Sequence, residues 1–427
     1  MARWLETPRN ENSPLAGLRV LELARVLAGP WAGQILADLG ADVIKVESPE
    51  GDNTRIWGPP WVDHDGETTS AYYHACNRGK RSLVADFRDV GDLDRVKDLA
   101  AGADVVLENF KTGTLARYGL DFASLEALNP LLVYCSITGF GQTGPWRDYV
   151  SSDLTHFAAG GQMASCGYDD ADDPAATPIA PDGGNAWHTG SHYAYIAIMA
   201  ALVQRTVTGE GDYIDASVHE ACALSTESAV ASWVFRGEPV IRQTGRHHSA
   251  NATPPTQFRC WDGKYVNAIL WGMTPSNLRR LAEWMAEHDL ADDLLDERYA
   301  DAAFMRQHHG HVVDVTARFI ANMTADEIYH GGQERGFTWS AVRAPDELLG
   351  DPHLADREFW TEVAHPDLGR SYTYPGPVAI YNGSPWRISR RAPLVGEHNE
   401  EVLQALGVLA EDIPGACGLE NPRGPLR

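Results

Sequence analysis

Basic side chains adjoin several of the apolar segments in the N-terminal third of the chain. Lys45 ends one segment, Arg55 lies in the loop after it, Lys80 and Arg81 precede the next, and Arg117 follows a later one. A single lysine or arginine is usually solvated surface charge. Because the carboxyl ends of parallel strands face one crevice, several cations there favour a shared anionic ligand. The pattern therefore indicates a polyphosphate ligand in a local basic pocket.

The turn after the first predicted strand, residues 24–30 (ARVLAGP), bears on the kind of ligand. A dinucleotide site would show GxGxxG here, because glycines let the backbone approach a pyrophosphate. Only Gly29 is present. Glu47 closes the second predicted strand, where a ribose-binding acid would lie in a nicotinamide-dependent dehydrogenase, but without the glycines that function is disfavoured.

Other reactive residue types lack the spacing of a site. His247 and His248, and the group His308, His309 and His311, lie in polar segments without cysteines or carboxylates at ligand spacing, so we expect no metal site. A GxSxG elbow is absent, which removes the usual nucleophile of an α/β-hydrolase. Six scattered cysteines without a CxxC pair are typical of reduced thiols in a cytosolic protein.

Short apolar runs alternate with helical patterns along the first half of the chain. This rhythm predicts a doubly wound α/β sheet, which binds ligands at the carboxyl ends of its strands. A segment rich in Gly, Pro and Asp, residues 165–185, reads as a functional loop, and residues 220–235 as a helix. The predicted strands span residues 18–23, 42–46, 81–87, 104–107, 131–137 and 213–218, and the predicted helices span 30–39, 93–101 and 187–204.

The second half of the chain has a different character. Residues 236–256 are polar and read as a linker into a second domain. Residues 260–269 read as a hairpin around Asp262-Gly263, and residues 275–335 as charged helices. From about residue 370 the chain returns to strand and turn patterns.

Composition narrows the class of protein. The 427 residues are 44% hydrophobic, which suffices for a sizeable core and suggests two domains. The net charge of −24 argues against a nucleic-acid binder but permits a small anionic ligand. The longest apolar run, residues 193–203, falls short of the ~18 residues of a membrane span, and the polar N-terminus lacks the apolar core of a signal peptide. We therefore expect a soluble cytoplasmic protein.

Six blocks of sequence in a fixed order resemble the family III CoA-transferases, the group of formyl-CoA:oxalate CoA-transferase, carnitine CoA-transferase and α-methylacyl-CoA racemase. The resemblance covers most of the chain. The first block comprises residues 14–23, 28–30 and 39–47, and the third comprises residues 108–110 and 117–120. The other blocks are residues 77–82, 136–145, 208–211 and 392–398.

The resemblance implies a fold and a ligand. A Rossmann-like large domain would comprise residues 1–235 and 369–427, with a smaller α+β domain inserted over residues 236–368. Two chains would interlock into a homodimer with the active site between domains. Coenzyme A or an acyl-CoA would bind as substrate, with no tightly bound cofactor and with neither nucleic acid nor membrane as partner. The positions that the family motifs assign to CoA are Arg25, Ala28, Lys45, Lys80, Arg81, Asn109 and Arg117.

The family's chemistry uses one aspartate. Its carboxylate attacks the thioester of a donor acyl-CoA and forms a mixed anhydride, and the CoA thiolate then returns to give an aspartyl-CoA thioester. The acceptor carboxylate attacks this ester and leaves as the new acyl-CoA. Covalent catalysis of this kind divides one difficult exchange into easier steps.

The chain departs from the family at the nucleophile. Ala186 stands near the place of the catalytic aspartate. Asp182, four residues upstream, is the candidate nucleophile, although a loop aspartate that caps a turn is the alternative. Asp153 is a second carboxylate with a supporting role by resemblance. His188 is either a base or a hydrogen-bonded core histidine.

Other reactions on the same fold stay open. The racemase branch requires a histidine immediately before the second carboxylate, and this chain has Ser152 there, so racemisation is disfavoured. The glycine-rich loop of formyl-CoA transferase is not recognisable in residues 245–255, so oxalate is not the expected acceptor. The alternatives to transfer are an isomerase or lyase of an acyl-CoA, and a CoA-binding protein without transferase activity.

Overall fold

The computed structural model describes residues 12–58, 60–62, 68–169, 175–181, 183–226, 228–409, 411 and 413. Contacts divide the chain into two compact units, which are described separately. The first comprises residues 1–160, 181–225 and 352–427, and the second comprises residues 161–180 and 226–351. The domain boundaries expected from the sequence stay a prediction.

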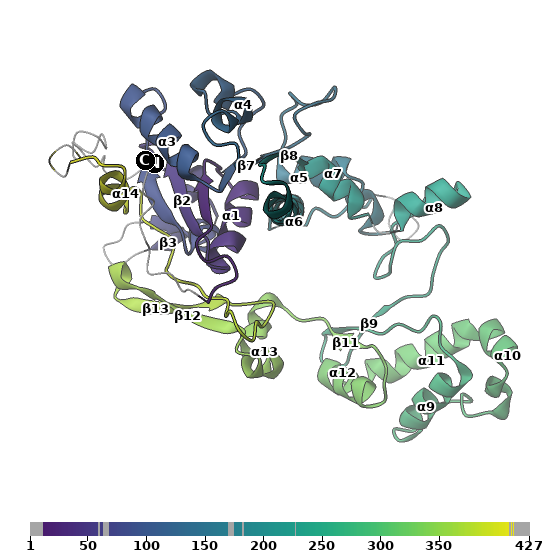
Figure 1. Cartoon of the computed structure of the whole chain (residues 1–427). Helices are drawn as coiled ribbons and strands as arrows, with labels where there is room; N and C mark the ends of the chain where they lie inside the picture. The colour runs from purple at the N-terminus through teal and green to yellow at the C-terminus, as the bar shows by residue number, and fades with distance from the viewer. Residues whose placement is uncertain are drawn as a thin grey trace. The chain divides into compact units, whose positions relative to one another are not determined.

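A six-stranded parallel sheet forms the centre of the first unit (Figure 1). The strand order is β5-β2-β1-β6-β7-β8, so the chain adds strands in one direction from β1 to β5 and then in the other from β6 to β8. Sheets of this order bind ligands where the direction reverses, beyond the carboxyl ends of β1 and β6. The predicted α/β class is confirmed. The strands are β1 (Arg19–Glu22), β2 (Asp42–Glu47), β5 (Arg81–Val84), β6 (Val105–Glu108), β7 (Val133–Thr138) and β8 (Asp212–Ser217).

Helices cover both faces of this sheet, which explains why its strands read as nearly continuous apolar runs. Val20 of β1 packs in the core of one face, with α1 (Ala28–Asp38), α6 (Asn185–Thr208) and α7 (Val218–Leu224). Its neighbour Leu21 packs in the core of the opposite face. That face is covered by α3 (Val90–Gly102), α4 (Phe122–Glu126) and α14 (Asn399–Ala405).

Two segments of this unit differ from the sequence prediction. The helix expected over residues 220–235 ends at Leu224, where the Ser225 hydroxyl donates to the Ala221 carbonyl oxygen (2.9 Å) and competes with the helical backbone. The C-terminal region contains α14 besides the expected strands. The remaining elements of the unit are β3 (Pro60–Val62), β4 (Thr68–Ser70), α2 (Ala71–Asn77), α5 (Asp153–Ala159), α13 (Pro352–Asp356), β12 (Trp360–His365) and β13 (Arg370–Pro375).

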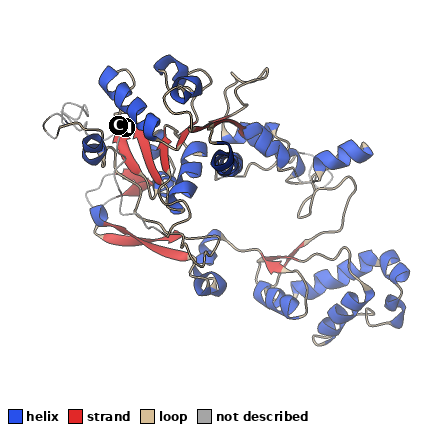
Figure 2. Cartoon of the chain, in the orientation of Figure 1, coloured by secondary structure: helices blue, strands red, loops and turns tan. Residues whose placement is uncertain are grey.

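The second unit is mainly helical (Figure 2). Trp284, Phe319 and Trp339 are central to its apolar core. The predicted hairpin turn is confirmed at Gly263, whose φ of 81° suits glycine. Across the described residues of both units, no helix has the length and apolar character to span a membrane. The elements of the second unit are α8 (Ala229–Arg236), β9 (Gln257–Arg259), β10 (Tyr265–Asn267), α9 (Pro275–Ala286), α10 (Ala302–Gln307), α11 (His309–Ala321), α12 (Ala325–Glu334) and β11 (Ser340–Ala341).

Candidate functional site

A cavity of about 310 Å³ lies at the carboxyl ends of β1, β6 and β7. Its position matches the ligand site of a doubly wound sheet, because β1 and β6 are the strands at which the strand order reverses. We call it the switch-point cavity. It is lined by residues 26–28, 109–112, 137–140 and 147–151, together with His156, Trp187 and Val218.

The turn after β1 is held by Asn109, the residue that follows β6. The Arg25 backbone N–H donates to Asn109 Oδ1 (2.8 Å), and Asn109 Nδ2 donates to the Arg25 carbonyl oxygen (2.6 Å). Val26 then adopts a φ of 67°, which is rare for a β-branched residue and is found where surrounding contacts enforce it. A Cβ on Gly29 would lie 2.1 Å from Ala24 Cβ, so this glycine allows α1 to approach the turn.

The start of α6 lies beside the cavity. Asp153, at the first position of α5, accepts a hydrogen bond from the Trp187 backbone N–H (3.0 Å). Ala186, the residue that the resemblance puts near the family's aspartate, is fully buried. The candidate nucleophile Asp182 lies outside the described residues. His188 contacts the Trp31 ring (centroids 4.1 Å apart), and burial lowers its pKa.

Two of the predicted ligand-binding lysines are fully buried and already paired. Glu22 binds Lys45 (3.1 Å) and Lys80 (2.7 Å), and Asp52 also binds Lys45 (2.8 Å). Burial lowers the pKa of Lys80 to about 8, although Glu22 opposes the shift. Despite burial, Asp52 and Glu22 raise the pKa of Lys45. These lysines neutralise carboxylates beneath the first turn, and direct contact with a ligand stays a prediction.

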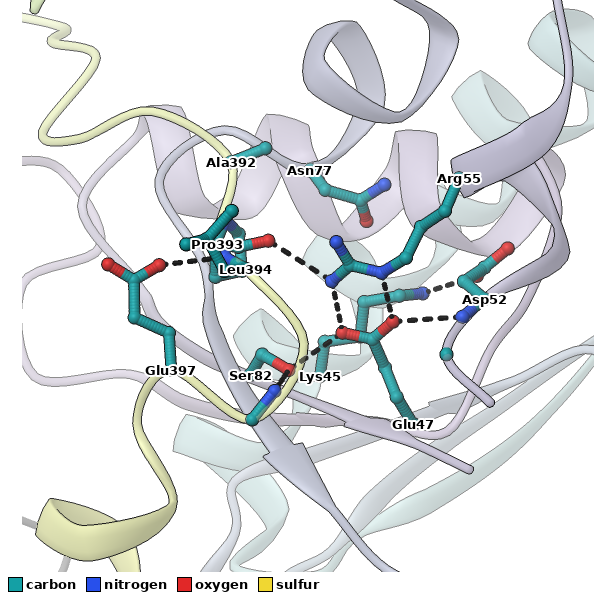
Figure 3. A network of polar contacts seen from close by, with 12 residues as sticks. Lys45, Glu47, Asp52, Arg55, Asn77, Ser82, Ala392, Pro393, Leu394 and Glu397 are labelled. Carbon is teal, nitrogen blue, oxygen red and sulfur yellow. Dashed lines mark hydrogen bonds and ion pairs between the residues drawn. The ribbon is translucent and has the colours of Figure 1, made fainter. Parts of the chain in front are cut away.

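The C-terminal segment, residues 392–398, joins the same network (Figure 3). Arg55 binds Glu47 with two nitrogens (2.7 and 2.8 Å) and donates to the Pro393 carbonyl oxygen (3.1 Å). Ser82 donates to the same Glu47 carboxylate (2.7 Å), and Glu397 accepts from the Leu394 backbone N–H (2.7 Å). The network therefore joins residues 392–398 to the carboxyl end of β2 and to β5.

The other predicted ligand contacts lie in different places. Ala28 lines the cavity, and its carbonyl oxygen accepts from the Ser191 hydroxyl (2.6 Å). Arg81 is the first residue of the edge strand β5, where it pairs with Asp42 and Glu401. It therefore lies at the amino end of its strand, and the expectation that it faces a crevice at the carboxyl ends is wrong. Arg117 is exposed in the turn after β6.

Sequence reasoning missed a polar group on the cavity wall. Thr112, Thr138 and His156 line the cavity and carry buried side-chain atoms without a hydrogen-bond partner. The motif that contains Thr138 was recognised, but its lack of a partner depends on tertiary packing. Among the described residues, no group of three His, Cys, Asp or Glu side chains could hold a metal ion.

Comparisons with known proteins assign the family. The model of CoA-transferase family III matches residues 15–399. The chain is 38% identical to a succinate–glutarate CoA-transferase of Agrobacterium fabrum, covering 93% of this chain and 96% of the relative. It is 31% identical to the human succinyl-CoA:glutarate CoA-transferase, covering 94% and 88%. A CAIB/BAIF family protein from Brucella suis has a similar structure, with a TM-score of 0.79 at 34% identity, covering 92% of this chain and all of that one. The chain belongs to CoA-transferase family III and is a CoA-transferase.

Proposed function

We propose that this enzyme moves CoA from a succinyl-CoA-type donor to a carboxylic acid acceptor through a covalent aspartyl intermediate. The observation that carries the proposal is the switch-point cavity, which brings the turn after β1, the ends of β6 and β7 and the start of α6 together. The relatives support the donor, because their names include succinyl-CoA:glutarate and succinyl-CoA–D-citramalate CoA-transferases.

CoA binds along the carboxyl ends of the strands. Arg25 and the exposed Arg117 contact its phosphates, and Asn109 fixes the turn against which the pantetheine arm packs. Lys45 and Lys80 act indirectly, since their ion pairs hold β1, β2 and the turn in register. Arg25→Ala and Arg117→Ala should each weaken CoA binding about tenfold by calorimetry.

Asp182 is the proposed nucleophile, because it lies three residues before α6, whose first turn lines the cavity. Its oxygen attacks the thioester carbon, the C–S bond breaks, and the thiolate leaves with the electron pair. The thiolate then attacks the aspartyl carbonyl of the anhydride, forms aspartyl-CoA and releases the donor acid. The acceptor carboxylate attacks aspartyl-CoA, which gives a second mixed anhydride and frees the thiolate again. The thiolate finally attacks the acyl carbon of the acceptor, so the new acyl-CoA forms and the aspartate carboxylate leaves. Asp153 positions α6 through the Trp187 N–H.

The test is the transfer reaction itself. The enzyme is incubated with succinyl-CoA and each of a panel of carboxylic acids, and new acyl-CoA species are detected by mass spectrometry. We expect Asp182→Asn to lose at least 10³-fold in kcat, because an amide cannot form the anhydride, and Asp153→Asn to lose less. Full activity of Asp182→Asn would remove its assigned role. If the acyl group of the donor changed whether or not an acceptor acid was present, an isomerase or lyase would be favoured. If CoA bound but no acid was converted, a CoA-binding protein without transferase activity would be favoured.

A homodimer is also part of the proposal. The first unit exposes Tyr193, Ile196, Val203 and Val207 along α6, and large apolar side chains exposed on one helix are typical of an interaction surface. Light scattering should give twice the 46.7 kDa mass of one chain, whereas a monomer at micromolar concentration would contradict it. We place the enzyme in the cytoplasm, since the five described cysteines are free thiols.

A further inference from the structure

Three side chains on the wall of the switch-point cavity carry polar atoms that bond to nothing in the described part of the chain. They are Thr112 Oγ1, Thr138 Oγ1 and both ring nitrogens of His156. His156 is 0% exposed and Thr138 is 8% exposed. Buried polar groups without partners are destabilising, and in native proteins they usually await water or a ligand.

The three side chains come from separate elements, which makes their convergence a tertiary feature. Thr112 follows β6, Thr138 ends β7, and His156 lies on α5. Phe140 covers His156 on one side (ring centroids 5.0 Å apart). A Cβ on Gly139 would lie 2.9 Å from His156 Nε2, so the glycine leaves room beside the ring.

Thr112, Thr138 and His156 are all uncharged hydrogen-bond donors, which favours an anion as their ligand. Burial, with a smaller contribution from the neighbouring His219, lowers the pKa of His156 to about 4. The ring is therefore neutral at pH 7 and offers one N–H donor, and each threonine offers a hydroxyl donor. At the rim, Arg147 and Asp148 line the cavity as an exposed ion pair (3.4 Å).

We propose that Thr138 and His156, with Thr112, bind the distal carboxylate of a dicarboxylic acyl group during CoA transfer. The inference rests on the proposed function, in which the thioester lies near the start of α6. Leu27, Ile137 and Val218 line the same cavity as Trp187 and these donors, and their apolar side chains suit the methylene groups of a short acyl chain. The three polar side chains are thus specificity-determining residues.

The experiment compares two donors of equal chain length, succinyl-CoA and butyryl-CoA, with one saturating acceptor. Butyryl-CoA has a methyl group where succinyl-CoA has its second carboxylate. The wild-type enzyme should prefer succinyl-CoA at least 100-fold in kcat/KM. Thr138→Val preserves the shape and removes the hydroxyl, so it should reduce this preference at least tenfold, as should His156→Phe.

Two variants separate specificity from folding. Thr138→Ser keeps a hydroxyl and should retain most of the preference. Thr373→Val changes an exposed threonine on β13 in the same chemical way and should leave the preference unchanged.

The outcomes distinguish the two proposals. Equal loss of kcat/KM for both donors would assign the polar group to the pantetheine arm and overturn the inference. A wild-type enzyme that uses both donors equally would also overturn it, while CoA transfer would stand. Absence of transfer from any donor would refute the proposed function instead.

Discussion

Substitution of Glu22 by glutamine tests the buried ion network most sharply. Glu22 is fully buried and binds both Lys45 and Lys80. In Glu22→Gln, Lys45 keeps the Asp52 carboxylate, but Lys80 keeps only the Pro30 carbonyl and Asn77 side-chain oxygens. Removal of one partner of a buried pair costs about 3–5 kcal/mol, so we expect that loss in unfolding free energy at pH 7.

The pH dependence of the unfolding free energy provides an independent test of the same network. The pKa of Lys80 is depressed to about 8 from 10.5, so its unfolded form binds the proton more tightly between those values. Its contribution to stability is therefore fully present above pH 10.5 and lost as the pH falls through 8. Glu22 raises the pKa of Lys80, so without Glu22 this pKa falls further and the pH range over which stability changes extends below pH 8. Glu22→Gln should recover part of its stability between pH 7 and 9.5.

Urea unfolding followed by circular dichroism measures both effects. Lys80→Met in the Glu22→Gln background removes the stranded cation and should restore at least about 2 kcal/mol. A Glu22→Gln loss below about 1 kcal/mol, or a double variant as unstable as the single one, would refute the role assigned to the network.

Three further changes have defined outcomes. Burial raises the pKa of Glu108 from 4.5 to about 7, so the stability that its protonated form provides below pH 4.5 is lost as the pH rises to 7. Glu108→Gln should therefore have an unfolding free energy about 1–3 kcal/mol above wild type at pH 8 and equal to wild type at pH 4. Equal unfolding curves at pH 8 would contradict this. Asn109→Ala removes both hydrogen bonds to the Arg25 backbone and should raise the CoA dissociation constant measured by calorimetry at least tenfold. Unchanged affinity would show that the turn after β1 does not contribute to CoA binding. A Cβ on Gly33 would lie 2.0 Å from Glu22 Oε2, so Gly33→Ala should cost about 1–3 kcal/mol, while the matched Gly310→Ala meets open space and should be neutral or stabilising in thermal unfolding.

The sequence predicted the sheet because its signal is local. The central strands β1, β2, β6 and β7 are apolar runs whose alternate side chains enter the two cores, so periodicity is enough to find them. The end of α7 at Leu224 and the formation of α14 depend on side-chain hydrogen bonds, which apolar periodicity does not reveal. Ser225 ends α7 through its own hydroxyl, and the Asn399 side chain accepts a hydrogen bond from Val84 N–H, 315 residues away.

The site was harder to predict because charge partners are distant in sequence. Lys45 and Lys80 are cations in the sequence, but their pairing with Glu22 is visible only after folding. Asn109, which its motif singled out, lines the cavity, and its contact with CoA stays a prediction. His156 carries no sequence signal, since its unpartnered nitrogens depend on how β7 and α5 pack.

Trapping of the covalent intermediate tests the mechanism most directly. The enzyme is incubated with succinyl-CoA, reduced with borohydride, digested, and its peptides are mapped by mass spectrometry. The proposed mechanism predicts that one aspartate, Asp182, is converted to homoserine, because borohydride reduces an aspartyl-CoA thioester to the alcohol. Continued turnover with every carboxylate unmodified would contradict a covalent aspartyl intermediate.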